Sequence, residues 1–303
     1  LLVWGQIWVE TTPQDFWDGE FDPLLYASRR LQVEGTNPAD SGAVEFYPRF
    51  DADGDGYYDL LGAEAFGNAH IIYGTPQGYA DASNNPYKDA SFPSDSGGNS
   101  DLADLNLDGY PELIHSGWGT GVCRIFWGTP SGPDPTNYTE LPNGNAEAVY
   151  VYDLDRDGFL DIILAGDDGN LYVYWGEGYD PTTMYDPSRR SRRSLGTVGH
   201  NIEVADLNKD GYPDVIVPTG SAFSASFTVL WGDNDRDLSN NGTWSAGGMG
   251  IGYAHGLTLG DFNRDGWLDI VVTRYNKFMG ASSAYVYWNS SGSFSNTNRT
   301  KTV

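Results

Sequence analysis

The stretch DADGDGYYDLL, from Asp51 to Leu61, places carboxylates at positions 51, 53, 55 and 59 and a glycine at position 56. Like charges this close repel one another, and folding increases the repulsion unless a counter-charge is present. Alternating acids on a tight loop direct several oxygens at one centre, and a glycine lets the chain turn sharply there. The stretch predicts a loop that holds a hard divalent cation, with a solvated acidic turn as the alternative.

Four further copies of this pattern follow along the chain. They are DLNLDGYPELI from Asp104, DLDRDGFLDII from Asp153, DLNKDGYPDVI from Asp206 and DFNRDGWLDIV from Asp261. Every copy has Asp at position 1, Asp or Asn at 3, Asp at 5, Gly at 6, an aromatic residue at 7 and Asp or Glu at 9. We name them loops 1 to 5, for residues 51–59, 104–112, 153–161, 206–214 and 261–269. Recurrence about every 50 residues indicates a repeat architecture and disfavours chance acidic turns.

The loops do not fit the helix-flanked calcium loop known as the EF-hand. That loop requires a bidentate Glu at position 12, where this chain has Gly62, His115, Leu164, Val217 and Val272. The residues that follow each loop are apolar or β-branched, as in LDIIL and PDVIV, which is typical of buried strands. We therefore expect position 9 to close each site and each loop to join two strands.

A second marker recurs later in each unit, at IIYGTPQG (71–78), IFWGTPSG (125–132), VYWGEG (173–178), VLWGD (229–233) and VYWNSSG (286–292). Each is a short apolar strand that ends in an aromatic residue and a turn. Three or four short antiparallel strands per unit match one blade of a β-propeller. The predicted units are 41–90, 91–142, 143–196, 197–246 and 247–303, here called units 1 to 5. Residues 1–40 are expected to be a partial or degenerate blade or a preceding segment.

The D-x-[DN]-x-D-G-x-x-[DE] loops and the YWG…G strand ends resemble the FG-GAP/VCBS-type repeats of the integrin-alpha-like β-propeller family, over about residues 41–300. The resemblance implies an all-β propeller of four-stranded blades, with five clear repeats, in a family that commonly has seven blades. It implies a structural Ca²⁺ in each loop, bound by side chains at positions 1, 3, 5 and 9 and by the carbonyl at position 7. The implied ligands are Asp51, Asp53, Asp55, Tyr57, Asp59, Asp104, Asn106, Asp108, Tyr110, Glu112, Asp153, Asp155, Asp157, Phe159, Asp161, Asp206, Asn208, Asp210, Tyr212, Asp214, Asp261, Asn263, Asp265, Trp267 and Asp269.

The composition limits the partners of this chain. Seventeen basic residues against 42 acids give a formal net charge of −25, which argues against nucleic acid and disfavours anionic membranes. No run of about 18 apolar residues is present, so direct insertion into a membrane is not expected. Cys123 is the only cysteine, so no internal disulfide forms, and its apolar surroundings predict a small core residue.

The loop type bears on the location of the protein, and its sequons bear on glycosylation. Calcium modules of the weaker kind saturate at about 10⁻⁴–10⁻³ M free calcium, which favours secretion or a cell surface. Four N-x-[ST] sequons, at Asn137, Asn241, Asn289 and Asn298, are potential glycan acceptors in a secreted eukaryotic protein.

Catalytic patterns are scarce in the sequence. There is no G-x-S-x-G, phosphate loop, HExxH or Cys–His signature. The many acids leave a glycosidase-like pair open, but 17 of the 42 acids, nearly half, lie in the loops. We therefore expect no enzymatic activity, no catalytic residue and no organic cofactor.

Three features leave alternatives open. Glu45, Glu147, His200 and His255 each lie six residues before a loop and form either a polar or metal-binding ring at a central channel or solvated strand starts. SRRSRRS (188–194) is either a solvated insertion, a protease-sensitive loop or a contact for an acidic partner or second copy. Aromatic residues at fixed repeat positions are expected in the core, which leaves Trp17, Trp118 and Trp244 as surface candidates.

The function expected from the sequence is a binding or adhesion module for a protein or glycan. The alternatives are a structural subunit or decoration of a surface assembly or filament and, less favoured, an enzyme accessory domain, because one fold serves many functions. Loops 1 and 3, with four acids each, are expected to hold calcium more tightly than the loops with Asn at position 3.

Overall fold

A computed structural model describes most of the chain. The described residues are 29–33, 42–46, 51–57, 59–63, 68–74, 92, 98–196, 198–199, 201–221, 224–233, 236, 238–245, 253–275 and 283–302. All regular elements among these residues are strands. In this part of the chain no helix is long and apolar enough to cross a membrane.

Units 2 to 5 each form a four-stranded antiparallel sheet in which consecutive strands are neighbours. Unit 2 contains β5 (Ser100–Ala103), β6 (Glu112–Ser116), β7 (Val122–Phe126) and β8 (Tyr138–Pro142). Unit 3 contains β9 (Ala146–Tyr152), β10 (Asp161–Gly166), β11 (Asn170–Tyr174) and β12 (Ser191–Ser194). Unit 4 contains β13 (Glu203–Ala205), β14 (Asp214–Ser221), β15 (Ser224–Leu230) and β16 (Asn241–Ser245). Unit 5 contains β17 (Tyr253–Gly260), β18 (Asp269–Tyr275), β19 (Ser283–Tyr287) and β20 (Arg299–Thr302).

Two smaller sheets precede these four. β1 (Arg29–Val33) pairs with β2 (Gly42–Phe46), and β3 (Leu60–Ala63) pairs with β4 (Ala69–Ile72). β1 lies within the segment 1–40, so this segment contributes a strand that pairs with unit 1. Residues 1–28, which include Trp17, lie outside the described residues.

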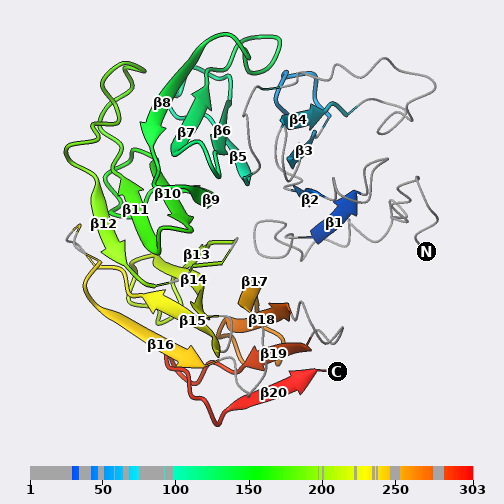
Figure 1. The fold of residues 1–303 in the computed structure, drawn as a ribbon, viewed down its shortest axis with the longest axis vertical. Coiled ribbons are helices and arrows are strands. Elements are labelled where there is room, and N and C mark those ends of the chain that lie inside the picture. The colour runs from blue at the N-terminus through cyan, green and yellow to red at the C-terminus, as the bar shows by residue number, and fades with distance from the viewer. Residues whose placement is uncertain are drawn as a thin grey trace.

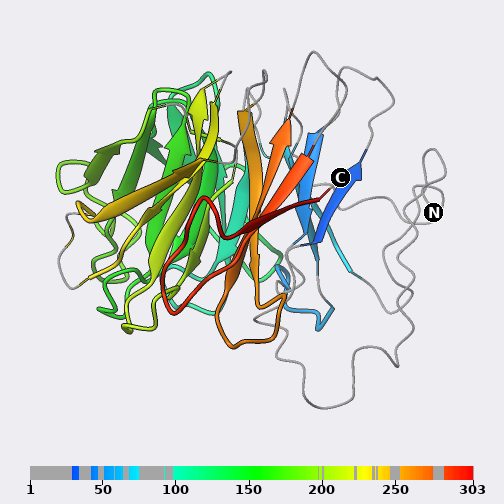
Figure 2. The same cartoon turned by 90° about the horizontal axis from the view of Figure 1, so that it is seen from below.

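The sheets follow one another around an arc (Figure 1). The first strand of each four-stranded sheet lies on the inner side of the arc, and the fourth strand lies on the outer side. Seen from below, the sheets stand side by side with their faces toward one another (Figure 2). This arrangement of blade-like repeats confirms the predicted all-β class.

The core lies between neighbouring sheets. On β10, Ile162 and Leu164 pack in a cluster with Ile125 of unit 2, whereas Ile163 packs in a cluster with Val215 of unit 4. Successive side chains of a strand point to opposite faces, so a sheet with neighbours on both sides buries every residue of its second strand. This explains the apolar run after loop 3, where all six residues of β10 are buried.

Candidate metal centres

In units 2 to 5 the acidic loop joins the first strand of a sheet to the second, and loop 1 directly precedes β3. In each of these four sheets the loop follows the first strand, which is an edge strand, and leads into the second. The loops therefore lie at the same end of their sheets. All 25 residues predicted as ligands lie among the described residues.

The first Asp of every loop organises the turn. One of its oxygens accepts the backbone N–H of position 5 and the other accepts the N–H of the glycine at position 6, at 2.7–3.1 Å. In loop 3 these donors are Asp157 and Gly158. The pattern needs an acceptor with two oxygens at position 1, which explains why Asp is found there in every copy.

Positions 3 and 5 continue the coil of the loop. The Oδ1 atom of the Asp at position 5 accepts the N–H of position 7 in all five loops. The side chain at position 3 accepts the N–H of position 5 in loops 2 to 5. Where position 3 is Asn, its amide Nδ2 also donates to the Oδ2 atom at position 5, at 2.8–3.0 Å.

Position 9 differs from the other acids because it is buried. Asp161 accepts the Leu154 N–H through Oδ2 and the Gly176 N–H through Oδ1, both at 2.8 Å. The equivalent pair of bonds exists at Asp59, Glu112, Asp214 and Asp269. The carboxylate therefore ties the loop to the end of the third strand of the same unit.

Burial of these carboxyl groups has an electrostatic consequence. Desolvation raises the pKa of Asp59 to about 6 and the pKa of Glu112, Asp161 and Asp214 to about 7, and it also raises the pKa of Asp269. The two backbone N–H donors act in the opposite direction, and the other acids of each loop raise the pKa further. A nearby cation favours the ionised form of such groups.

Two loops bring three carboxylates together. Ligand oxygens of Asp51, Asp53 and Asp59 in loop 1 lie within 4.8 Å of one another, and so do those of Asp153, Asp155 and Asp161 in loop 3. In loops 2, 4 and 5 an Asn stands at position 3 and offers an amide oxygen in place of a carboxylate. An all-oxygen donor set of this kind fits Ca²⁺, which takes six to eight oxygen ligands.

The aromatic residues at position 7 are not in the core, so that prediction is wrong. Tyr57 and Tyr110 are about 40% exposed, and the rings of the other three are partly exposed. The Lys209 ammonium lies 4.3 Å from the centre of the Trp267 ring, which links loop 4 to loop 5.

The glycine of the YWG marker has a role that the sequence did not reveal. Its N–H is the second donor to the position-9 carboxylate, as at Gly176. A Cβ atom on Gly176 would lie 2.4 Å from the Leu160 carbonyl oxygen, so the approach requires glycine. In unit 5 the equivalent residue is Asn289, whose backbone N–H donates to Asp269 in the same way. Its side-chain amide also donates to the Leu207 and Leu268 carbonyls, at 2.9 and 3.1 Å.

This burial makes Asn289 unsuited to carry a glycan, because its side chain is 2% exposed and its amide is engaged. Asn137, Asn241 and Asn298 are exposed, and their glycosylation stays a prediction. The buried Cys123 lies in the cluster between units 2 and 3, as expected for a core residue.

The second half of the arginine-rich stretch is a strand, and the turn before it stays exposed at Ser188 and Arg189. Ser191–Ser194 is β12, the outer strand of unit 3. Arg190 donates to the Pro142 carbonyl at 2.8 Å and to the Tyr174 hydroxyl, whereas Arg193 donates to the Ser239 carbonyl at 3.0 Å. These arginines therefore join unit 3 to both of its neighbours.

The structure describes part of the predicted polar ring and two of the three tryptophans singled out as surface candidates. Glu147 is buried at the start of β9, so a solvated strand start is wrong for this residue. The side chains of Glu45, His200 and His255 lie outside the described residues, and the proposed ring stays a prediction. Trp244 stacks on Phe227 in the core of units 4 and 5, and the Trp118 indole donates to Asp167 at 2.6 Å.

Repeated four-stranded sheets, each with an oxygen-rich loop between its first and second strands, define a class of all-β protein built from blade-like repeats. Residues 153–217, from loop 3 to β14, match the family model of the FG-GAP-like repeat. The chain therefore carries a repeat of this family, and the resemblance predicted from the loops is confirmed for this segment. In a sequence comparison, no curated protein matches the chain.

Proposed function

We propose that this chain is a calcium-stabilised extracellular β-propeller module that binds a protein or glycan through the end of the sheets that carries the loops. The observation that carries the calcium part is the convergence of three carboxylates in loops 1 and 3. Without a cation these groups repel one another, and Ca²⁺ bound only to the folded chain stabilises it by mass action. Asp161 and its equivalents add a buried carboxyl group to each site.

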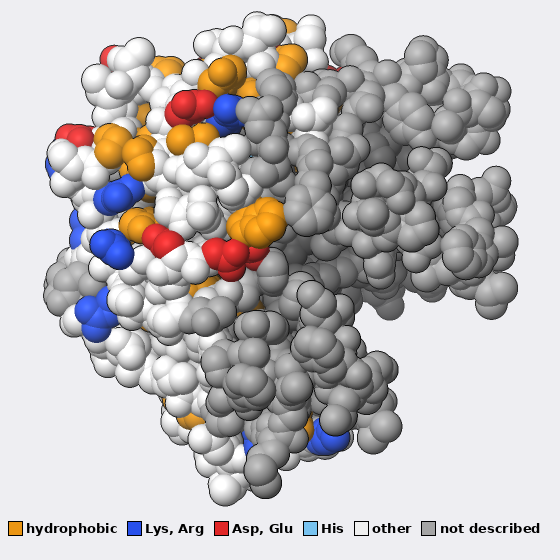
Figure 3. Space-filling view, viewed as in Figure 1, with side chains coloured by type: hydrophobic (Ala, Val, Ile, Leu, Met, Phe, Trp, Pro, Cys, Tyr) orange, Lys and Arg blue, Asp and Glu red, His pale blue; other side chains and the backbone are white. Residues whose placement is uncertain are grey.

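The binding part is supported by side chains that the loops expose. Tyr57, Leu107, Tyr110 and Phe262 are exposed by 39–62% and lie in loops 1, 2 and 5. Exposed aromatic side chains are enriched where proteins bind partners. On the face shown in Figure 3, acidic and basic side chains of the described residues are interspersed, so no broad basic surface for nucleic acid is visible there.

The test combines calcium titration by calorimetry with thermal unfolding. We expect calcium binding with a stoichiometry near the number of loops and a strong decrease in melting temperature on addition of EDTA, because the apo loops repel internally. An unchanged melting curve in EDTA would contradict the proposal.

The ligand part is tested on a glycan array and against candidate surface proteins in calcium. Binding that is reduced in Tyr57→Ser and Tyr110→Ser but retained in Tyr138→Ser supports the loop end as the binding face. Tyr138 is the matched control, because it is 43% exposed and lies on the outer strand β8. Equal loss in all three variants would refute this assignment.

A further inference from the structure

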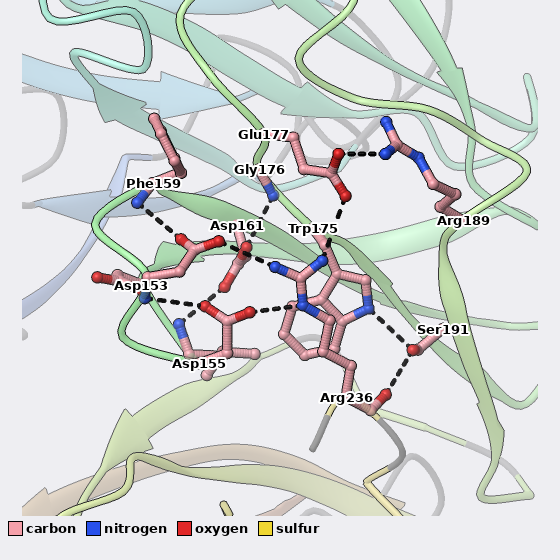
Figure 4. A network of polar contacts seen from close by, with 12 residues as sticks. Asp153, Asp155, Phe159, Asp161, Trp175, Gly176, Glu177, Arg189, Ser191 and Arg236 are labelled. Atoms are coloured by element: carbon pink, nitrogen blue, oxygen red, sulfur yellow. Dashed lines mark hydrogen bonds and ion pairs between the residues drawn. The ribbon is translucent and has the colours of Figure 1, made fainter. Parts of the chain in front are cut away.

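An arginine from unit 4 lies on the candidate metal loop of unit 3. Arg236, in the connection between β15 and β16, places Nε 2.5 Å from Asp155 Oδ2 and one terminal nitrogen 2.9 Å from Asp157 Oδ2 (Figure 4). Its other terminal nitrogen lies 3.3 Å from Glu177 Oε1. All three guanidinium nitrogens therefore face carboxylates of unit 3.

The guanidinium is held in this place by its surroundings. It lies over the Trp175 ring, 5.1 Å from the ring centre. The Arg236 carbonyl accepts the Ser191 hydroxyl at 2.6 Å, and this hydroxyl accepts the Trp175 indole N–H at 2.9 Å. Glu177 is also paired with Arg189 (Figure 4). A planar cation fixed by stacking and by its own backbone is preorganised to stay on the loop.

The contact takes the place of one that loops 2, 4 and 5 make internally. In loops 2, 4 and 5 the Asn amide at position 3 donates to the Oδ2 atom of position 5. Loop 3 has Asp155 at position 3, which has no amide to donate. Arg236 instead bridges positions 3 and 5 from outside, so it neutralises the extra acid of loop 3.

In units 2 and 5, the connection between the third and fourth strands has a glycine close to the loop of the preceding unit, where unit 4 has Arg236. An added Cβ on Gly132, five residues after Trp127, would lie 3.6 Å from the Ala52 carbonyl oxygen of loop 1. An added Cβ on Gly292 would lie 3.0 Å from Asn208 of loop 4. The turn after the third strand of one unit thus lies on the loop of the preceding unit, and at loop 3 this turn brings a cation.

In Asp155 and Asp157 the two carboxylate oxygens have different partners: Oδ1 accepts a backbone N–H, and Oδ2 faces the guanidinium. Oδ1 of Asp155 accepts the Asp157 N–H, and Oδ1 of Asp157 accepts the Phe159 N–H. A metal ion bound through these two Oδ2 atoms would therefore meet the guanidinium on the same oxygens.

We propose that Arg236 is an internal competitor of calcium at loop 3, an inference that rests on the calcium proposal above. Calcium binding at this loop requires the guanidinium to leave Asp155 and Asp157, and thereby loosens the contact between units 3 and 4. Because coupling is reciprocal, a partner that draws this connection away tightens calcium binding at loop 3.

The experiment compares calcium titrations of the whole chain and of Arg236→Ala by calorimetry. We expect Arg236→Ala to tighten one site by about fivefold or more, since coupling of this size is typical of linked sites. Arg193→Ala is the matched control, because Arg193 binds the same connection through the Ser239 carbonyl while Arg236 stays on the acids of loop 3, and we expect a much smaller gain in affinity. In an Asp153→Asn background, which weakens loop 3, the effect of Arg236→Ala should disappear.

A second readout follows the guanidinium directly. In NMR spectra of arginine-labelled protein, the Arg236 Nε–H signal is expected to move toward the position of a solvated arginine as calcium is added. If Arg236→Ala does not fold, Arg236→Gln and Arg236→Lys replace it, with the larger gain in affinity expected for Gln. Unchanged or weaker calcium binding in these variants, while the other loops bind, would overturn this inference alone. Absence of calcium binding at every loop would overturn both proposals.

Discussion

At the scale of single residues, the backbone of the loops explains which positions vary. Position 6 has φ between 86° and 96° in all five loops, a region that side chains rarely adopt, and it is always Gly. Position 4 lies near the left-handed helical region, with φ of 54° at Leu107 and 62° at Arg156. Non-glycine residues enter that region at a modest cost, so position 4 is free to vary whereas position 6 is not.

A substitution in loop 2 separates backbone strain from packing. Gly109→Ala is expected to destabilise the protein by about 1–3 kcal/mol and to weaken calcium binding, because alanine is strained at φ 91°. An added Cβ there has no neighbour within 4 Å, so no steric clash contributes. Urea unfolding measures the effect. Leu107→Ala, at a position that is 62% exposed in the same loop, serves as the control, with an expected change within about 0.5 kcal/mol. Equal stability of the two variants would count against this explanation.

At the scale of elements, each sheet is closed by contacts between its loop and its outer strands. The position-9 carboxylate binds the end of the third strand, as Asp214 does through the Gly232 N–H at 2.9 Å. The tryptophan at the same strand end donates to a hydroxyl on the fourth strand, as in Trp127 to Thr139 at 3.0 Å. Loop, third strand and fourth strand therefore behave as one unit, and a change at position 9 affects the whole sheet.

Asp214→Asn tests this role of position 9 without calcium. The amide cannot accept both the Leu207 and Gly232 N–H groups, so one buried donor loses its partner. We expect a loss of about 1–3 kcal/mol in the free energy of unfolding in EDTA. Asp210→Asn, at an exposed position of the same loop, is expected to weaken calcium binding with much less effect on the apo protein. If the two variants unfold alike in EDTA, position 9 has no structural role beyond the metal.

At the scale of the whole molecule, charge and assembly are linked. The chain has a formal net charge of −25, and three acids converge in each of loops 1 and 3. Cations from neighbouring loops and connections offset part of this charge, as Lys209 does over Trp267 and Arg236 does at loop 3. We therefore expect the stability of the folded chain to depend on bound cations as well as on its apolar core.

The calcium-free protein is expected to lose stability as the pH rises from about 4 to about 7. The pKa of the buried position-9 carboxyls is raised from 3.8 toward 7, as at Asp161, so the folded state binds more protons than the unfolded state in this window. Stability is then greatest below the unfolded pKa and falls as these groups ionise. Thermal unfolding in EDTA across this range measures the trend, and saturating calcium should remove it by favouring the ionised form. A melting temperature that rises with pH in EDTA would disprove the assignment.

The sequence by itself determined the loops, the strands and the blade-like repeat. These features depend on residues within a few positions of one another, such as Asp153 and the N–H groups of Asp157 and Gly158, and on apolar runs that fit a sheet buried on both faces. The repeated spacing also picked out the acidic positions of the loops, whereas the full set of candidate ligands was implied by the resemblance to FG-GAP/VCBS-type repeats and stays a prediction.

Only the tertiary structure decided which segments meet. The contact of Arg236 with Asp155 joins residues 81 positions apart, and the burial of Asn289 depends on the Leu207 carbonyl of the preceding unit. The inclusion of Ser191–Ser194, the second half of the arginine stretch, in β12 also depends on pairing with the neighbouring strand β11. Spacing along the chain fixes local hydrogen bonds and side-chain alternation, whereas contacts between units arise from packing that no single repeat contains.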